Sequence, residues 1–90
     1  GDQIKSEFFL LLLFSKYIPN ETMNTVLNER VLYLRQKLEQ FKYDGPVPGN
    51  LDAIRNEKSV SFIRGLASAL IETGLNYMEK NRHLLKKKPN

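Results

Sequence analysis

Apolar residues along the chain fall into three segments, and the first of them is apolar without interruption over 8–14, where the sequence reads FFLLLLF. Successive residues of a helix are turned by about 100°, so such a run covers the whole circumference of a helix. A helix that is apolar all round is typically a buried helix. Because no breaker occurs before Ile18-Pro19, the pattern predicts a helix over about 2–17.

The second segment begins after Pro19 and has a regular heptad-like spacing. Asn20 is followed by the acidic Glu21, which predicts a helix N-cap at Asn20 and a helix over about 20–43. Its apolar residues are spaced by 4, 3, 4 and 3, as in the seam of a coiled coil, and they are Leu27, Val31, Leu34, Leu38 and Phe41. This spacing suits a contact within one subunit and a contact between two subunits equally well.

A predicted loop separates the second segment from the third. Residues 44–50 contain two prolines and two glycines, which marks a loop, and residues 51–58 suit either a short extra helix or more of the connection. A helical pattern then runs over about 59–86, with an apolar stripe wider than one neighbouring helix needs. Gly74 lies inside it, and a glycine in a helix costs about 1 kcal/mol relative to alanine. We therefore expect another helix to approach closely at Gly74.

The sequence predicts one all-α domain over 1–90, and its net charge of +4 comes from one end. Nine basic and nine acidic residues balance over 1–78, whereas the last twelve residues hold five basic residues and one acid. Basic residues at the end of a helix complement the partial charge of its last carbonyls. The basic tail also lacks the interleaved aromatic residues of a nucleic-acid surface, so we interpret it as a helix terminus with a solvated tail.

The FFLLLLF run does not predict a membrane segment. It has seven residues, whereas a membrane-spanning helix needs about 20 apolar residues. Asp2 and Glu7 also disfavour a secretory signal peptide. The chain has no cysteine, which fits a reducing compartment, and we expect a cytoplasmic protein without a membrane partner.

Candidate catalytic chemistry is sparse in the sequence. We find no serine, histidine and aspartate set, no phosphate-binding glycine loop and no cluster with metal-ligand spacing. His83 stands among basic residues, where a solvated histidine is the simplest interpretation. We expect no enzyme, no metal and no cofactor.

Three helices of this kind present more apolar surface than they can cover for one another, since a chain of 90 residues buries only about 60% of its unfolded surface. A second copy is the simplest cover, and closed two-fold dimers are the commonest solution. We therefore expect an intertwined homodimer with long coiled-coil-like helices. The predicted interface residues are Phe8, Phe9, Leu11, Leu12, Phe14, Leu27, Val31, Leu34, Leu38, Leu70, Gly74, Tyr77 and Met78.

The order of these features also suggests a family. Glu7-Phe8 and the aliphatic run end in Leu13-Phe14-Ser15, followed by IPNET, the heptad segment LNERVLYLRQKLEQF, a loop, and a last helix carrying Gly74-Leu75-x-Tyr77. This order resembles the C-terminal domain of PadR-family transcriptional regulators, the type called virulence activator alpha C-terminal, over about residues 4–85.

The resemblance implies a C-terminal homodimerisation module that positions two DNA-binding heads. In such regulators a separate N-terminal winged helix-turn-helix domain binds DNA, and no such segment is found in this sequence. We therefore expect the chain alone to bind DNA weakly or not at all. Two alternatives stay open: a stand-alone helical adaptor for another protein, and an effector-sensing domain that binds a small aromatic molecule between its helices.

Overall fold

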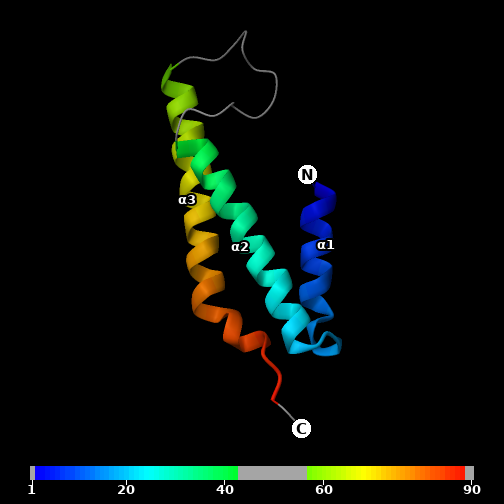
Figure 1. Ribbon diagram of the computed structural model, residues 1–90. Helices are drawn as coiled ribbons and strands as arrows, with labels where there is room; N and C mark the ends of the chain where they lie inside the picture. Colours follow the sequence, from blue (N-terminus) through cyan, green and yellow to red (C-terminus); the bar gives the residue numbers. More distant parts are fainter. Residues whose placement is uncertain (1, 43–56, 89–90) are drawn as a thin grey trace.

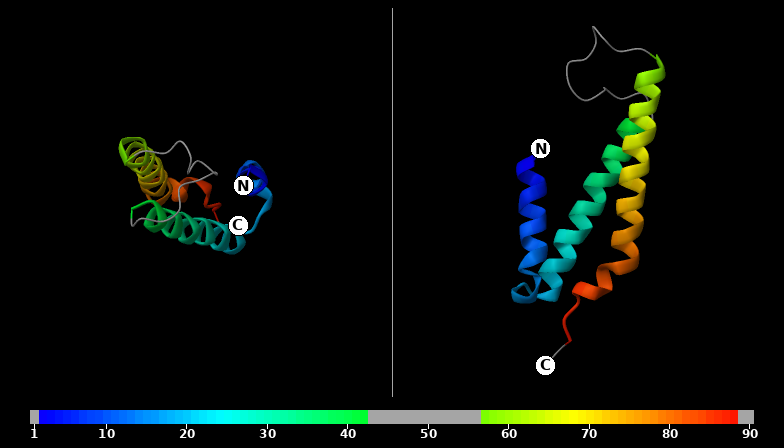
Figure 2. Two further views of the ribbon diagram at one scale, coloured as in Figure 1. Left: turned by 90° about the horizontal axis from the view of Figure 1, so that it is seen from above. Right: turned by 180° about the vertical axis from the view of Figure 1, so that it is seen from behind.

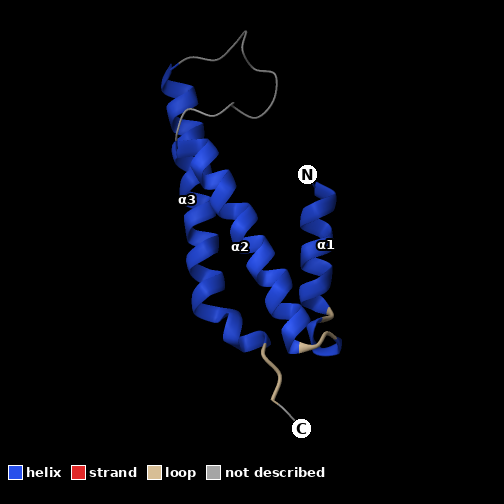
Figure 3. Ribbon diagram, viewed as in Figure 1, coloured by secondary structure: helices blue, strands red, loops and turns tan. Residues whose placement is uncertain are grey.

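A computed structural model of the chain describes residues 2–42 and 57–88, with side chains from Glu7 onward. Its elements are the helices α1 (Asp2–Leu13), α2 (Asn20–Lys42) and α3 (Glu57–Asn81) and the 3₁₀ turns η1 (Ser15–Tyr17) and η2 (Arg82–Leu85). The described residues contain no strand (Figure 3). The predicted all-α class with three helices is confirmed.

The three helices run in alternating directions and form an elongated, bent layer with α2 in the middle (Figure 1). The molecule measures 58 × 24 × 15 Å. Helices α2 and α3 form the most closely packed pair, whereas α1 diverges from α2 toward its N-terminus (Figures 1 and 2). The radius of gyration is 16.3 Å, compared with about 12 Å for a compact domain of this length. The fold is therefore open on the side of α1.

Helix α1 is shorter than the predicted helix over 2–17, because the chain tightens after Leu13. Phe14 has φ −96° and ψ 16°, and the amide of Tyr17 donates to the carbonyl oxygen of Phe14 at 2.9 Å, which makes a 3₁₀ turn. Ile18 is extended, with φ −103° and ψ 129°, as expected of a residue before proline.

The buried core lies along α2. The buried hydrophobic residues among those described are Met23, Leu27 and Val31, which are 2%, 6% and 9% exposed. They follow one another at intervals of four residues, so they lie on one face of α2. Leu27 and Val31 belong to the predicted seam, and that part of the seam packs inside the chain.

Helix α3 starts at Glu57 and ends at Asn81, after which η2 and an extended Lys86 complete the segment predicted as one helix over 59–86. Its start shows that Glu57 and Lys58, from the ambiguous stretch 51–58, belong to the helix. The rest of that stretch and the predicted loop at 44–50 lie outside the described residues.

None of the helices in the described parts of the chain is both long enough and apolar enough to cross a membrane.

Candidate partner-binding groove

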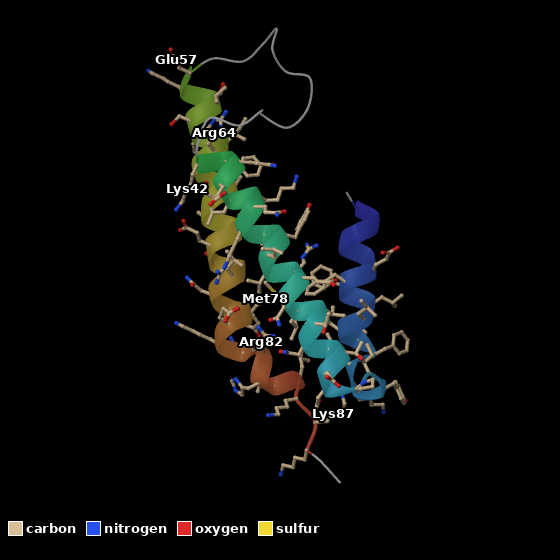
Figure 4. All side chains as sticks on the ribbon, viewed as in Figure 1. Lys42, Glu57, Arg64, Met78, Arg82 and Lys87 are labelled. Atoms are coloured by element: carbon tan, nitrogen blue, oxygen red, sulfur yellow. The ribbon has the colours of Figure 1, made fainter. Side chains whose placement is uncertain are left out.

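An open apolar groove lies between α1 and α3, with α2 beneath it. Its volume is about 540 Å³. The lining side chains are mostly apolar, and they are Phe8, Phe9 and Leu12 of α1, Leu27, Arg30 and Leu34 of α2, Thr73, Gly74, Tyr77, Met78 and Asn81 of α3, and Arg82, Leu84 and Leu85 of η2. Met78 and Arg82 mark the α3 side of this groove in Figure 4.

Arg30 connects α1 with α2 at one wall of the groove. Its guanidinium carbon lies 4.9 Å from the ring centroid of Phe8 and 5.1 Å from that of Tyr33. A guanidinium held near two aromatic rings gains a cation–π attraction to each of them. This contact fixes α1 at Phe8, while the next residue, Phe9, remains 60% exposed.

The α3 wall of the groove contains Gly74, where we expected another helix to approach closely. Within the single chain this close approach is not found. A Cβ built on Gly74 meets no atom within 4 Å, and the same holds for Gly65. No helix of the same chain therefore needs the glycine for a close approach. If a close approach explains Gly74, the approaching helix belongs to another molecule.

Two arginines, Arg82 of η2 and Arg64 of α3, connect the C-terminal part of the chain with the two ends of α2. Near the start of α2, Arg82 Nη2 donates to the side-chain oxygens of Asn24 at 2.5 Å and Asn28 at 2.9 Å. Near the end of α2, Arg64 Nη1 lies 3.3 Å from the carbonyl oxygens of Gln40 and of Phe41. A cation at these carbonyls compensates the negative end of the helix dipole.

The extended tail after η2 is held to the corner between α1 and α2 (Figure 4). Asn20 Nδ2 donates to the carbonyl oxygen of Lys87 at 2.7 Å, and the amide of Lys87 donates to Asn20 Oδ1 at 2.8 Å. Lys87 Nζ also donates to the carbonyl oxygen of Ser15 at 2.7 Å. The side chain of Asn20 therefore binds the tail, and the predicted N-cap role of Asn20 is not observed.

The predicted interface residues fall into three groups. Those that line the groove are Phe8, Phe9, Leu12, Leu27, Leu34, Gly74, Tyr77 and Met78. Leu11, Phe14 and Leu70 lie outside it and are 40%, 52% and 65% exposed. Val31 is buried within the chain and Leu38 is half-buried, so this part of the α2 seam packs against other residues of the same chain.

Sequence reasoning missed an exposed row on α3. Phe62 and Leu66 are 72% and 52% exposed and continue the row that Leu70 and Tyr77 mark. Their spacing of four residues was visible in the sequence as one face of a helix. The signal was hidden because the apolar stripe of α3 is wide enough to suggest burial of the whole segment.

The described residues hold no group of three or more histidine, cysteine or acidic side chains that could bind a metal. His83 is exposed, and no hydrogen bond or ion pair described for this part of the chain joins its side chain to an acidic residue. The site therefore consists of apolar surface flanked by arginines and amides. Searches against protein-family models, curated proteins and solved structures found no match for this chain.

Proposed function

We propose that the chain is a homodimerisation module, and that it serves a PadR-like transcriptional regulator by positioning two DNA-binding heads. The observation that supports dimerisation most directly is the exposure of α1. Four apolar residues of α1 and the residue that follows the helix are exposed to solvent. They are Phe9, Leu10, Leu11, Leu13 and Phe14, with exposed fractions of 60%, 54%, 40%, 79% and 52%. The single chain does not shelter the helix that its sequence marks for burial.

The size of this surface supports a partner rather than a solvated face. With about 200 Å² for each full side chain, these five residues expose roughly 500 Å² of apolar area. At about 25 cal/mol per Å², covering it yields about 12 kcal/mol, which is comparable to the whole stability of a small domain. Exposed apolar surface of this extent often marks a binding site.

The small interior of the chain also supports a covering partner, because the buried hydrophobic residues among those described are Met23, Leu27 and Val31. A second copy is the economical partner because one surface then covers itself in a closed two-fold dimer.

The regulatory part of the proposal is supported by the residue order that resembles PadR-family C-terminal domains. A dimerisation module sets the distance and angle between two DNA-reading heads, whose half-sites lie about one helical turn apart on DNA. In this role DNA is bound by a separate winged-helix domain, and the module itself contributes geometry.

Sedimentation equilibrium of the chain and of two variants tests the proposal. We expect a dimer for the natural sequence and a dissociation constant raised by about a hundredfold in Phe9→Glu, because a charge enters the apolar interface. Leu32→Glu is the matched control, since Leu32 on α2 is also 60% exposed but lies outside the groove. A natural chain that sediments as a monomer at micromolar concentration contradicts the proposal and favours the adaptor alternative.

The groove gives specific support to one further candidate function, the binding of an aromatic effector. Its volume of about 540 Å³ is within the range of small-molecule sites, and Arg30 and Arg82 offer guanidinium groups at an otherwise apolar lining. Thermal stabilisation of the dimer by a planar aromatic anion, lost in Arg30→Met, is the expected result if the groove binds such a ligand.

A further inference from the structure

We infer that the corner between α1 and α2 is a binding site for an extended peptide that contains a lysine. Residues 86–88, called the tail below, occupy this site within the chain, and their release joins the groove to a second cavity. The site is called the tail site, and it is formed by Ser15 and Asn20. The inference concerns a single chain and does not depend on the proposed dimerisation.

The tail site binds the backbone of its ligand through Asn20. The side-chain amide of Asn20 donates from Nδ2 to the carbonyl oxygen of Lys87 and accepts at Oδ1 from the amide of Lys87, at 2.7 and 2.8 Å. One side chain thus satisfies both backbone groups of one residue. Every residue except proline presents these two groups in an extended segment. Asn20 therefore selects an extended backbone without reading its side chains.

The lysine side chain of the ligand is bound by Ser15. Lys87 Nζ donates to the carbonyl oxygen of Ser15 at 2.7 Å. The same oxygen accepts from the amide of Ile18 at 3.1 Å, so the turn η1 holds it in place. A hydrogen bond from a charged donor is stronger than a neutral one. The tail site therefore prefers a lysine at the residue that pairs with Asn20.

A second cavity lies beside the start of α2, and the tail helps to separate it from the groove. Its volume is about 400 Å³, and its lining includes Met23 and Lys86. Three residues line both this cavity and the groove, namely Leu27, Arg82 and Leu85. Leu85 directly precedes the tail. The wall between the two cavities is thus held at one end by the bonds of the tail.

The wall has a second anchor, which stays in place when the tail leaves. Arg82 donates to the side-chain oxygens of Asn24 and Asn28 of α2, independently of the tail. Leu85 lies between this anchor and Lys87. Release of Lys87 therefore frees Leu85 at one end, while Arg82 keeps the end of α3 on α2. The groove then opens toward the start of α2 without unfolding of the helices.

A competing peptide has access to the tail site. Lys86 and Lys88 are exposed, and Asn20 and Lys87 are half-buried, so the bonds lie near solvent. A segment of another protein with a leucine two residues before a lysine offers the groups that Leu85 and Lys87 supply. Such a segment is the ligand that the tail site fits.

Peptide binding to the full-length variant Lys87→Pro tests the site. Proline removes the amide and the ammonium from the tail but leaves Asn20 and Ser15 unchanged. We expect the peptide HLLKKK, with the sequence of residues 83–88, to shift the side-chain amide signals of Asn20 in NMR spectra of this variant. The natural chain should bind the peptide at least about tenfold more weakly, because its own tail competes.

Two controls show whether the expected contacts bind the peptide. The peptide HLLKMK lacks the second-last lysine and should bind about tenfold more weakly. Asn20→Ala combined with Lys87→Pro should lose binding, as measured by the intensity of the peptide's own signals. A peptide that leaves Lys87→Pro unchanged, or that binds the double variant equally well, overturns the tail site.

The two methionines of the chain report on the two cavities, since Met23 lines the second cavity and Met78 lines the groove. In Lys87→Pro we expect the methyl signals of both to move, because the shared wall moves. Lys88→Pro is the matched control: Lys88 is exposed, and the bonds of Lys87 stay. The same comparison in Phe9→Glu separates this effect from pairing. A shift of Met23 alone, or of neither methionine, overturns the joining of the cavities, whether or not the chain dimerises.

Discussion

At the scale of single residues, Asn20 shows where local pattern and tertiary contact compete. An asparagine before an acid at a helix start predicts an N-cap, yet the side chain of Asn20 binds both backbone groups of Lys87, 67 residues away. The amide of asparagine offers a donor and an acceptor side by side, which suits an extended backbone as well as a helix end. No feature within a few residues of Asn20 indicates this partner.

Replacing Asn20 with alanine tests the contribution of this contact. We expect Asn20→Ala to lower the free energy of unfolding by about 1–2 kcal/mol, since two part-buried hydrogen bonds are lost. Hydrogen exchange at the amide of Lys87 should become faster. Gln36→Ala, at an exposed site on α2, is the control and should change stability by less than about 0.5 kcal/mol. Unaltered exchange at Lys87 contradicts the contact.

At the scale of helices, the apolar pattern predicted the three helices and their order, from an uninterrupted apolar run for α1 and from helical spacing for α2 and α3. The ends of the helices were predicted less well. After Leu13 and after Asn81 the chain forms 3₁₀ turns, and the helix propensities of these residues do not indicate such turns. The groove was predicted in part, since Phe8, Leu34 and Met78 follow from the pattern. The direction in which α1 diverges depends on Arg30 and on the bound tail, and neither contact has a local signature.

Gly74 allows a prediction at this scale through a series of side-chain sizes. In a monomeric background such as Phe9→Glu, Gly74→Ala and Gly74→Leu should both fold and gain up to about 1 kcal/mol, because a Cβ has open space and helix propensity improves. In the dimer, Gly74→Ala should retain affinity, whereas Gly74→Leu should weaken it because the larger side chain obstructs the close approach of a second molecule that we expect at Gly74. Analytical ultracentrifugation measures the difference, and equal affinity for both variants contradicts the role of Gly74.

At the scale of the whole molecule, the single chain has little interior. The described residues bury three apolar side chains below a tenth of their surface, all on α2. Association should therefore contribute a large share of the stability of such a chain.

Thermal unfolding should therefore depend on protein concentration. We expect the melting temperature to rise by several degrees for each tenfold increase in chain concentration, since the dimer is the folded state that dilution removes. Scanning calorimetry over a hundredfold range of concentration measures this shift. Phe9→Glu should melt at a lower temperature that does not change with concentration, and a constant melting temperature in the natural chain contradicts the expectation.

The uncovered side of α1 also ties the lifetime of this protein to its rate of synthesis. A newly made chain without a mate displays Phe9 and Leu13, 60% and 79% exposed, to the chaperones and proteases that survey cells for exposed apolar segments. Pairing hides these residues, and the rate of pairing grows with the square of the number of chains. Weak expression then leaves most chains to be degraded, whereas strong expression protects them. The steady-state amount of protein should accordingly rise more steeply than gene dosage.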